Sequence, residues 1–443
     1  MRTTLIATLL AGVFATSNIH AADLLQLYRE ALANDAVFAS ARASLAAGSE
    51  REPQGFAQLL PVVGLGASST RTLADVTLGG ASSDRNNTTN AYTISLTQPL
   101  FRLANWESWQ QSKLQVAATR AVYAQAQQDL MVRISQAYFD VLAAQDTLAT
   151  VQAQKTAITE QLASAKRNFL VCTATITDTH EAQARFDLAV AQEFAAESDL
   201  QIKRAAVQQI IGKPPGMLAP FKPGLALTPP QPAAMQDWVS TAQGQNYGVL
   251  GQQLALEIAQ REIKRNRAGH APTLDLVASR GRSVVNGSPT TTATVIPGTQ
   301  SNSSQIGVQL NLPLFSGFAT TSRVREAIAL EDKARSDLDN ARRVAEQSAR
   351  QAFLGVSSGL AQVRALQAAE ISSQSALEAN QLGYEVGVRI NIDVLNAQQQ
   401  LFSTRRDLAR ARYDTVLNGL RLKSAAGVLK EEDLQQVNAL LQP

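Results

Sequence analysis

Apolar and polar residues alternate in four short stretches of the chain. In one of them, the apolar positions are Tyr92, Ile94 and Leu96, and the polar ones are Thr93, Ser95 and Thr97. Such alternation predicts a strand with one apolar face and one small or polar face. We predict strands at about 61–72, 90–101, 272–284 and 304–315. The segments 73–89 and 285–303 are rich in Gly, Ser, Thr and Asn, and we interpret them as loops.

A second pattern, with apolar residues three and four positions apart, covers most of the remaining chain. Between 104 and 168 there is no Pro or Gly, and the steps alternate along Ile134, Ala137, Val141, Ala144, Leu148 and Val151. This spacing is typical of a coiled-coil seam. We predict long helices at 104–168, 178–211, 318–382 and 391–426, and shorter helical regions at 23–56 and 237–267.

The order of strands and helices occurs twice. One strand pair ends in Pro99-Leu100-Phe101 and the other in Pro313-Leu314-Phe315, 214 residues later. A period of this length is too long for a solenoid repeat and indicates a duplicated half-chain. We therefore predict two structural repeats, 22–213 and 237–427. A proline-rich linker at 214–236 joins them, and a tail at 428–443 follows.

The first 21 residues have the features of a secretory signal peptide. Arg2 precedes an apolar core from Leu5 to Phe14, and small residues follow, with cleavage after Ala21 or Ala22 left open. No stretch approaches ~18 consecutive apolar residues, so we expect no transmembrane helix. Cys172 is the only cysteine, which excludes an intramolecular disulfide.

The composition gives little support for catalysis or nucleic-acid binding. The net charge is only +3, and charged residues make up 17% of the chain. Two histidines, His180 and His270, follow the signal segment, and they are far apart in the sequence. We find no Ser/His/Asp arrangement, metal-ligand spacing or phosphate-binding glycine loop, so we expect neither an enzyme nor a cofactor.

Four amphipathic strands in an exported chain are typical of the wall of a membrane barrel, with lipid outside and water inside. Four strands are too few to close a barrel, and lipid does not tolerate an open sheet edge. Other copies of the chain would have to complete it. The alternation alone also fits half-buried strands of a soluble protein. A periplasmic coiled-coil scaffold or adaptor, and a barrel enzyme, are therefore alternatives.

The chain resembles the TolC-type outer-membrane channels of Gram-negative efflux pumps and type I secretion systems. The resemblance covers nearly the whole mature chain, and its most specific parts are the segments from Gly383 to Ala397 and from Lys423 to Gly427. It implies a mainly α protein with a membrane β-barrel. In that fold a homotrimer forms a 12-stranded barrel continued by a helical periplasmic tunnel, and the linker and tail lie in a belt around it.

The resemblance also implies partners and a gate. The partners would be a periplasmic adaptor, an inner-membrane ABC or proton-driven transporter, and outer-membrane lipid. Links between coiled coils would involve Thr177, Asp178, Tyr384 and Arg389, and Asp393 would line the constriction. A second ring carboxylate of the family is replaced by Asn396 in this chain.

Capping is the alternative role for the acidic residues of this gate. Asp178, followed by Glu181 three residues later, has the pattern of an N-cap with a capping box, and Asp393 also fits a cap. The two roles are compatible, because helix caps lie at the turns that would form the tunnel tip. Cys172 is aligned with Gly387 of the second repeat, and nothing in the sequence assigns it a function.

Overall fold

The computed structural model describes residues 21–78, 80–171, 175–287 and 298–442. Residues 1–20, which hold almost all of the predicted signal segment, and Cys172 lie outside them. The chain forms two compact units. The sheet unit comprises Ser40–Ala126 and Val239–Ala349. The hairpin unit comprises Gln127–Trp238, the chain from Arg350 onward and the residues before Ser40.

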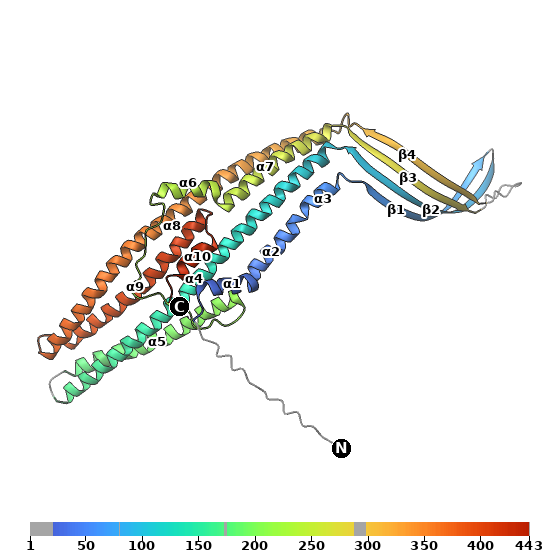
Figure 1. Cartoon of the computed structure of the whole chain (residues 1–443). Helices are drawn as coiled ribbons and strands as arrows, with labels where there is room; N and C mark the ends of the chain where they lie inside the picture. The colour runs from blue at the N-terminus through green and yellow to red at the C-terminus, as the bar shows by residue number, and fades with distance from the viewer. Residues whose placement is uncertain (1–20, 79, 172–174, 288–297, 443) are drawn as a thin grey trace, which may run out of the picture. The chain divides into compact units, whose positions relative to one another are not determined.

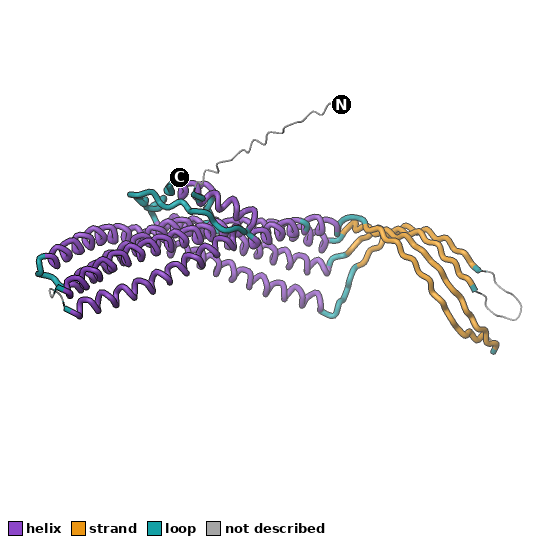
Figure 2. The backbone as a smooth tube through the Cα atoms, turned by 90° about the horizontal axis from the view of Figure 1, so that it is seen from below, coloured by secondary structure: helices purple, strands orange, loops and turns teal. Residues whose placement is uncertain are grey.

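The described strands of the sheet unit form one antiparallel sheet in the order β1-β2-β3-β4. The strands are β1 (Val62–Leu78), β2 (Ala81–Phe101), β3 (Thr273–Asn286) and β4 (Thr299–Asn311). They lie side by side as a single curved layer (Figures 1 and 2). Sequence neighbours are therefore also spatial neighbours, and the two strand pairs meet where β2 pairs with β3.

The interpretation of 73–89 as a loop was wrong. β1 and β2 stay paired through this segment, with Thr72 opposite Asn87 and Leu78 opposite Ala81. The ladder depends on backbone hydrogen bonds, which Ser, Thr and Asn form as well as apolar residues do. The polar composition therefore does not end the strands, because β1 continues to Leu78 and β2 begins at Ala81.

The strand ends also differ from the prediction. β4 stops at Asn311, so Leu312–Phe315 lie outside it, whereas Pro99–Phe101 remain within β2 at a shift in register. The following helix, α8 (Ala319–Glu385), begins one residue later than predicted. Phe318 precedes it with a left-handed backbone, φ 61°.

The two shorter helical regions are each interrupted. Residues 23–56 form α1 (Leu24–Asn34), α2 (Ala36–Ser49) and α3 (Arg51–Ala57). Asp35 separates α1 from α2 with extended backbone, and its carboxylate accepts a hydrogen bond from the Phe38 amide at 2.8 Å. A side-chain acceptor of this kind starts a new helix rather than continuing the old one.

Asn246 has the same effect in the second repeat, where it separates α6 (Met235–Gln245) from α7 (Tyr247–Arg267). Its side-chain oxygen accepts hydrogen bonds from the Gly248 and Val249 amides. A short 3-10 helix, η1 (Ala268–His270), then leads into β3.

The long helices form two hairpins, one in each repeat. The first consists of α4 (Leu103–Leu170) and α5 (Ile176–Ile211), and the second of α8 and α9 (Asn391–Ala425). Along the seam predicted in α4, Ile134, Val141 and Val151 are buried, whereas Leu148 is half-buried. None of the described helices combines the length and the apolar character needed to cross a lipid bilayer.

The linker and the tail pair with one another inside the hairpin unit. Phe221 of the linker forms an antiparallel bridge with Leu441 of the tail. The Gln442 amide donates to the Pro220 carbonyl oxygen at 2.8 Å. The tail also contains a short helix, α10 (Glu431–Asn438). Two segments more than 200 residues apart in sequence therefore share one layer against the hairpins.

An aromatic cluster anchors this layer. The Phe221 ring stacks on Tyr413 of α9 with centroids 4.9 Å apart, and both rings contact Phe139 of α4. Next to it, the Tyr138 hydroxyl donates to the Ala219 carbonyl oxygen at 2.7 Å. Burial raises the pKa of Tyr138, so this hydroxyl remains a donor at any physiological pH.

Candidate functional site at the hairpin tips

The tip of the second hairpin is a short turn between α8 and α9. Gly387 has φ 78°, a left-handed conformation that suits glycine. The Val388 and Arg389 amides both donate to the Gly383 carbonyl oxygen, at 2.8 and 3.1 Å. Helix α8 continues to Glu385, so Tyr384 lies in its last turn and not in the predicted connecting turn. The backbone position of this aromatic residue is consequently fixed by α8.

At the other tip, Asp178 is the third residue of α5 and a member of a capping box. The N-cap is Thr175, whose side chain accepts from the Asp178 amide at 3.2 Å. The Asp178 carboxylate in turn accepts from the Thr175 amide at 2.9 Å. Asp178 therefore caps as the partner of Thr175, and the predicted box with Glu181 was wrong. Its carboxylate stabilises the start of α5.

Tyr384 links α8 to α4. Its hydroxyl accepts from the Asn168 side-chain amide at 3.2 Å, and its ring packs against the buried Leu377, Val394 and Leu401. The ring position is thus fixed by apolar contacts. The hydroxyl adds one hydrogen bond between the two hairpins.

Arg389 pairs with Asp393, one helical turn further along, at 3.7 Å. The Arg389 side chain is 59% exposed and that of Asp393 34% exposed, so water weakens this ion pair. No hydrogen bond joins Tyr384 or Arg389 to Thr177 or Asp178 within the described part of the chain. Three of these residues, Asp178, Tyr384 and Arg389, nevertheless line one hollow of about 860 Å³.

The residues predicted for the constriction lie on another hollow, of about 470 Å³, which Asp393 and Asn396 line together. Asp393 is the third residue of α9, and the N-cap position is occupied by Ile390, whose side chain forms no capping hydrogen bond. The prediction of Asp393 as a plain cap was therefore wrong. The Asn396 side-chain oxygen accepts from Arg185 of α5 at 2.9 Å. An amide at 396 therefore serves as an acceptor between the hairpins.

Asn391 is the tip residue that the sequence did not reveal. It is 1% exposed and is the first residue of α9. Its side-chain oxygen accepts a hydrogen bond from the Gln161 side chain of α4. Its side-chain nitrogen donates to the backbone carbonyl oxygen of Asp178 at 3.2 Å. One side chain thus connects three helices. A neutral amide at a helix start has no pattern that distinguishes such a bridge from an ordinary cap.

Apolar packing surrounds this polar bridge. Leu395 of α9 is buried together with residues of the first hairpin, and Ile392 packs against the same cluster. The other buried members are Ile158, Leu162, Ala165, Ala182 and Ala189. The small alanines allow the helices to approach closely. The two tips are therefore held together by an apolar seam as well as by the polar links of Tyr384, Asn391 and Asn396.

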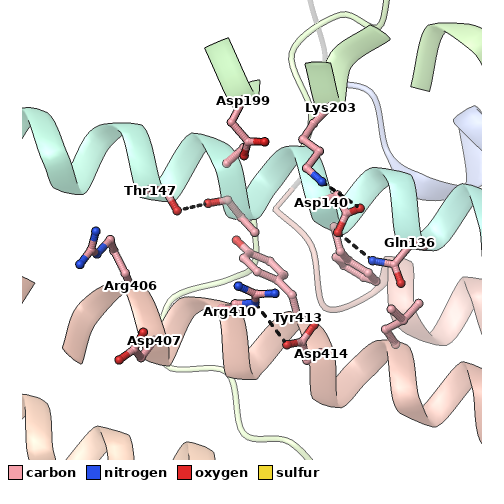
Figure 3. Close-up of a pocket in the computed structure, with 14 residues that line it drawn as sticks. Gln136, Asp140, Thr147, Asp199, Lys203, Arg406, Asp407, Arg410, Tyr413 and Asp414 are labelled. Atoms are coloured by element: carbon pink, nitrogen blue, oxygen red, sulfur yellow. Dashed lines mark hydrogen bonds and ion pairs between the residues drawn. The ribbon is translucent and has the colours of Figure 1, made fainter. Parts of the chain in front are cut away.

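A charged hollow of about 500 Å³ lies between α4, α5 and α9 (Figure 3). Lys203 approaches Asp140 to 3.8 Å, and Arg410 approaches Asp414 to 3.7 Å. Tyr413 projects between these pairs in the close-up. Carboxylates and cations alternate around the hollow, so it has no strong preference for one sign of ligand.

Beside this hollow, the Tyr413 hydroxyl donates to the Asp146 carboxylate at 2.7 Å. Burial raises the pKa of Asp146, and the hydrogen bond from Tyr413 opposes this shift. Burial and the nearby Asp146 charge also raise the pKa of Tyr413. The pair joins α4 to α9 and is a structural link. The described residues contain no cluster of His, Cys, Asp and Glu arranged to hold a metal ion.

Known proteins resemble this chain in both sequence and fold. The model of the outer membrane efflux protein family matches residues 27–213 and 238–428. The chain is 32% identical to the outer membrane protein TolC of Vibrio cholerae, covering 96% of this chain and 95% of that protein. It is 33% identical to the alkaline protease secretion protein AprF of Pseudomonas aeruginosa, covering 94% and 86%.

Solved structures of outer-membrane channels have the same fold. The structure of VceC from Vibrio cholerae has a TM-score of 0.76 and 19% identity, covering 91% of this chain and 96% of that one. The CmeC channel of Campylobacter jejuni has a TM-score of 0.78 and 17% identity, covering 95% and 90%. The chain therefore belongs to the outer membrane efflux protein family, and it is an outer-membrane exit duct for export with a helical periplasmic part.

Proposed function

We propose that three copies of the chain form one duct, which a periplasmic adaptor and an inner-membrane transporter open at the hairpin tips. The open sheet is the observation that carries the assembly. Within the described chain, β1 and β4 each pair on one side only. An unpaired edge has a high free energy in lipid because its backbone groups lack partners. Three sheets of four strands joined edge to edge give a closed barrel of twelve.

The two faces of the sheet support lipid outside and water inside. Leu65 lies opposite Ile94, and both are exposed, at 75% and 54%. On β4, Ile306 and Leu310 continue this face with exposures of 79% and 67%. The alternate positions hold small and polar residues, among them Thr93, Ser95, Gln309 and Asn311. In a closed barrel these residues line a wet lumen.

Assembly is tested by mass measurement in detergent. We expect a stable trimer, because a single chain leaves two strand edges open. Native mass spectrometry or light scattering with detergent correction gives the number of chains. A stable monomer that conducts ions would contradict the shared barrel.

We assign the closed state to polar links at the tips. In the assembly, Tyr384 and Arg389 connect one coiled coil to Thr177 and Asp178 of its neighbour. The open hollow beside Asp178, Tyr384 and Arg389 leaves room for such links. The contacts of Arg389 within the chain are hydrated and weak, so exchanging partners costs little free energy. Binding of an adaptor at the tip then supplies the free energy for opening.

The names of the relatives support a role in export. Alkaline protease secretion is named for AprF, and protease secretion for PrtF of Dickeya chrysanthemi, which is 31% identical over 98% of this chain. The family model is named for efflux. We propose that this chain is a passive conduit whose cargo is selected by the energised partner.

Ion selectivity tests the constriction. Threefold symmetry would bring three Asp393 carboxylates together, and their field favours cations. Asp393→Asn should therefore reduce the preference for K⁺ over Cl⁻, measured as the reversal potential in planar bilayers under a salt gradient.

Asn396→Asp is the matched variant of opposite sign. It adds a carboxylate beside Asp393 and should increase cation preference, although Arg185 at 2.9 Å from the present amide neutralises part of the new charge. Unchanged selectivity in both variants would remove these positions from the constriction.

A further inference from the structure

Two arginines of β3 interrupt the apolar face of the sheet. Arg280 lies opposite Ile94 on β2, and Arg282 lies opposite Tyr92. Directly opposed residues of an antiparallel pair share a face, so both arginines project from the apolar side. Both are exposed. In the assembly proposed above, this side faces lipid.

Their position along β3 determines where they meet the membrane. β3 begins at Thr273, directly after the periplasmic helices, and its first residues on this face are Leu274, Leu276 and Ala278. At ~3.4 Å per residue, Arg280 and Arg282 lie about 20 and 27 Å along the strand from Leu274. A strand tilt of ~40° reduces these lengths to heights of about 16 and 21 Å, which both lie in the outer half of an apolar band ~25 Å tall, with Arg282 the nearer to its far edge.

A charge on the lipid-facing side destabilises a barrel most at the midplane and least near the headgroups. A long arginine side chain extends its guanidinium further toward the headgroups. The Arg282 guanidinium therefore reaches the headgroup layer of the outer leaflet, and the Arg280 guanidinium, one strand period below, extends toward it. A lipid phosphate at this boundary would lie within reach of the pair.

The neighbouring strand completes an amphipathic site. Ser304 lies opposite Arg280, and Asn302 lies opposite Arg282. Arg282 also donates to the Gln300 side-chain oxygen at 2.7 Å, which orients its guanidinium. Among the residues that the structure describes, no carboxylate forms an ion pair with either arginine. The residues directly opposite the two cations on both neighbouring strands are therefore uncharged.

The same strand provides an apolar surface immediately below. Ile306, Val308 and Leu310 are 79%, 61% and 67% exposed. They follow the polar positions on the same face, in the direction of the periplasm. A molecule that matches this surface has an anionic head and long apolar chains.

We propose that Arg280 and Arg282 bind the phosphate of an outer-leaflet lipid headgroup, whose acyl chains pack on Ile306 and Val308. A guanidinium presents paired N–H donors that match phosphate oxygens, and this geometry is why arginine is preferred to lysine for phosphate. The inference rests on the proposed barrel, in which the apolar face is outward. It assigns one specific lipid contact to each protomer.

The test is a lipid titration of the full-length assembly in a non-ionic detergent. Native mass spectrometry counts bound lipid A as its concentration rises. The variant Arg280→Gln with Arg282→Gln should weaken binding about tenfold for each arginine, and hence about a hundredfold for both. Replacing both by Lys keeps the charge but loses the paired donors, so its affinity should lie between parent and Gln variant.

A matched control removes two other exposed arginines, Arg343 and Arg364 of α8, by the same change to Gln. It alters the net charge equally and should leave lipid A binding unchanged. Loss of binding in this control, or retained binding in the Arg280/Arg282 variant, would overturn the proposal. Because replacing a lipid-facing charge with a neutral group does not oppose insertion, the variant barrel should assemble normally.

Two further probes identify the source of the phosphate. Phosphatidylglycerol tests a glycerophospholipid as the source. The ligand is the lipid, lipid A or phosphatidylglycerol, whose affinity falls in the variant Arg280→Gln with Arg282→Gln. Inorganic phosphate tests a bare anion site, and displacement of lipid A by equimolar phosphate would contradict lipid recognition. The same spectra give the number of chains, so failure of the trimer is seen separately from failure of lipid binding.

Discussion

Replacing Tyr384 by Phe and Arg389 by Ser in the same chain should raise the single-channel conductance severalfold in planar bilayers. Both side chains end in polar groups that form contacts at the hairpin tips. Removing the Tyr384 hydroxyl deletes its hydrogen bond with Asn168, and removing the guanidinium deletes its ion pair with Asp393. With these groups gone, the neighbouring coiled coil also loses its proposed partners. The tip then opens more often or more widely.

The variant should retain its fold because the links contribute little to overall stability. Each link is partly hydrated and contributes ~1 kcal/mol. The phenyl ring that remains after Tyr384→Phe keeps the apolar contacts with Leu377, Val394 and Leu401. The seam of α4, with Ile134 and Val141 fully buried, is untouched. Trimer mass and membrane insertion should therefore equal those of the parent.

Single changes should give intermediate conductance, since either link alone still biases the closed state. The matched control is Tyr247→Phe with Arg364→Ser, which removes the same groups from α7 and α8 away from the tip turn. It should conduct like the parent. If the tip variant also conducts like the parent, Tyr384 and Arg389 act only in packing and turn formation, and the gate lies elsewhere.

Replacing Arg102 by Leu should lower the stability of the sheet unit by about 2 kcal/mol, because two charge-assisted hydrogen bonds are lost while the 38% exposure of the Arg102 side chain lets water weaken the pair. Arg102 follows the end of β2, and its Nε and Nη2 atoms donate to the two Asp275 carboxylate oxygens at 2.7 and 2.6 Å. Asp275 is 8% exposed. The change would leave its charge buried without a partner. The midpoint of thermal unfolding, followed by circular dichroism in detergent, should fall by several degrees.

A second substitution separates two effects on stability: the loss of the Arg102–Asp275 contact and the unpaired charge left on Asp275. Arg102→Leu combined with Asp275→Asn removes both charges and should recover much of the loss, because most of the penalty comes from the unpaired carboxylate. The control Arg325→Leu removes an exposed arginine of α8 in the same unit and should have little effect. Equal midpoints for parent and Arg102→Leu would show that the pair is energetically neutral.

Local patterns in the sequence predicted the main strands and the long helices. Strict alternation at Tyr92–Thr97 identified β2, and steps of three and four from Ile134 to Val151 identified the seam of α4. The predicted strand start at 272 is within one residue of Thr273, and the predicted helix start at 391 is that of α9. Periodicity succeeds here because each side chain's burial depends on its position along one element.

The same patterns failed where a polar residue had a partner inside the fold. Asp35 and Asn246 each divide a predicted helix because their side chains cap the next one. The segment 73–89 is strand because its two halves pair with each other, whatever their composition. Asp178 caps with Thr175 and not with Glu181. Propensity describes a residue by itself, whereas these outcomes depend on a specific acceptor or donor nearby.

The sequence by itself determined a duplicated chain of amphipathic strands and coiled-coil hairpins, since both features depend on spacing within a single element. Only the tertiary structure decided which polar groups meet. Arg102 and Asp275 are 173 residues apart in sequence, and Gln161 and Asn391 are 230 apart. Strand register alone set Arg280 beside Ile94. A hydrogen bond or a shared face between distant segments depends on where the backbone brings them together, and periodicity carries no information about that distance.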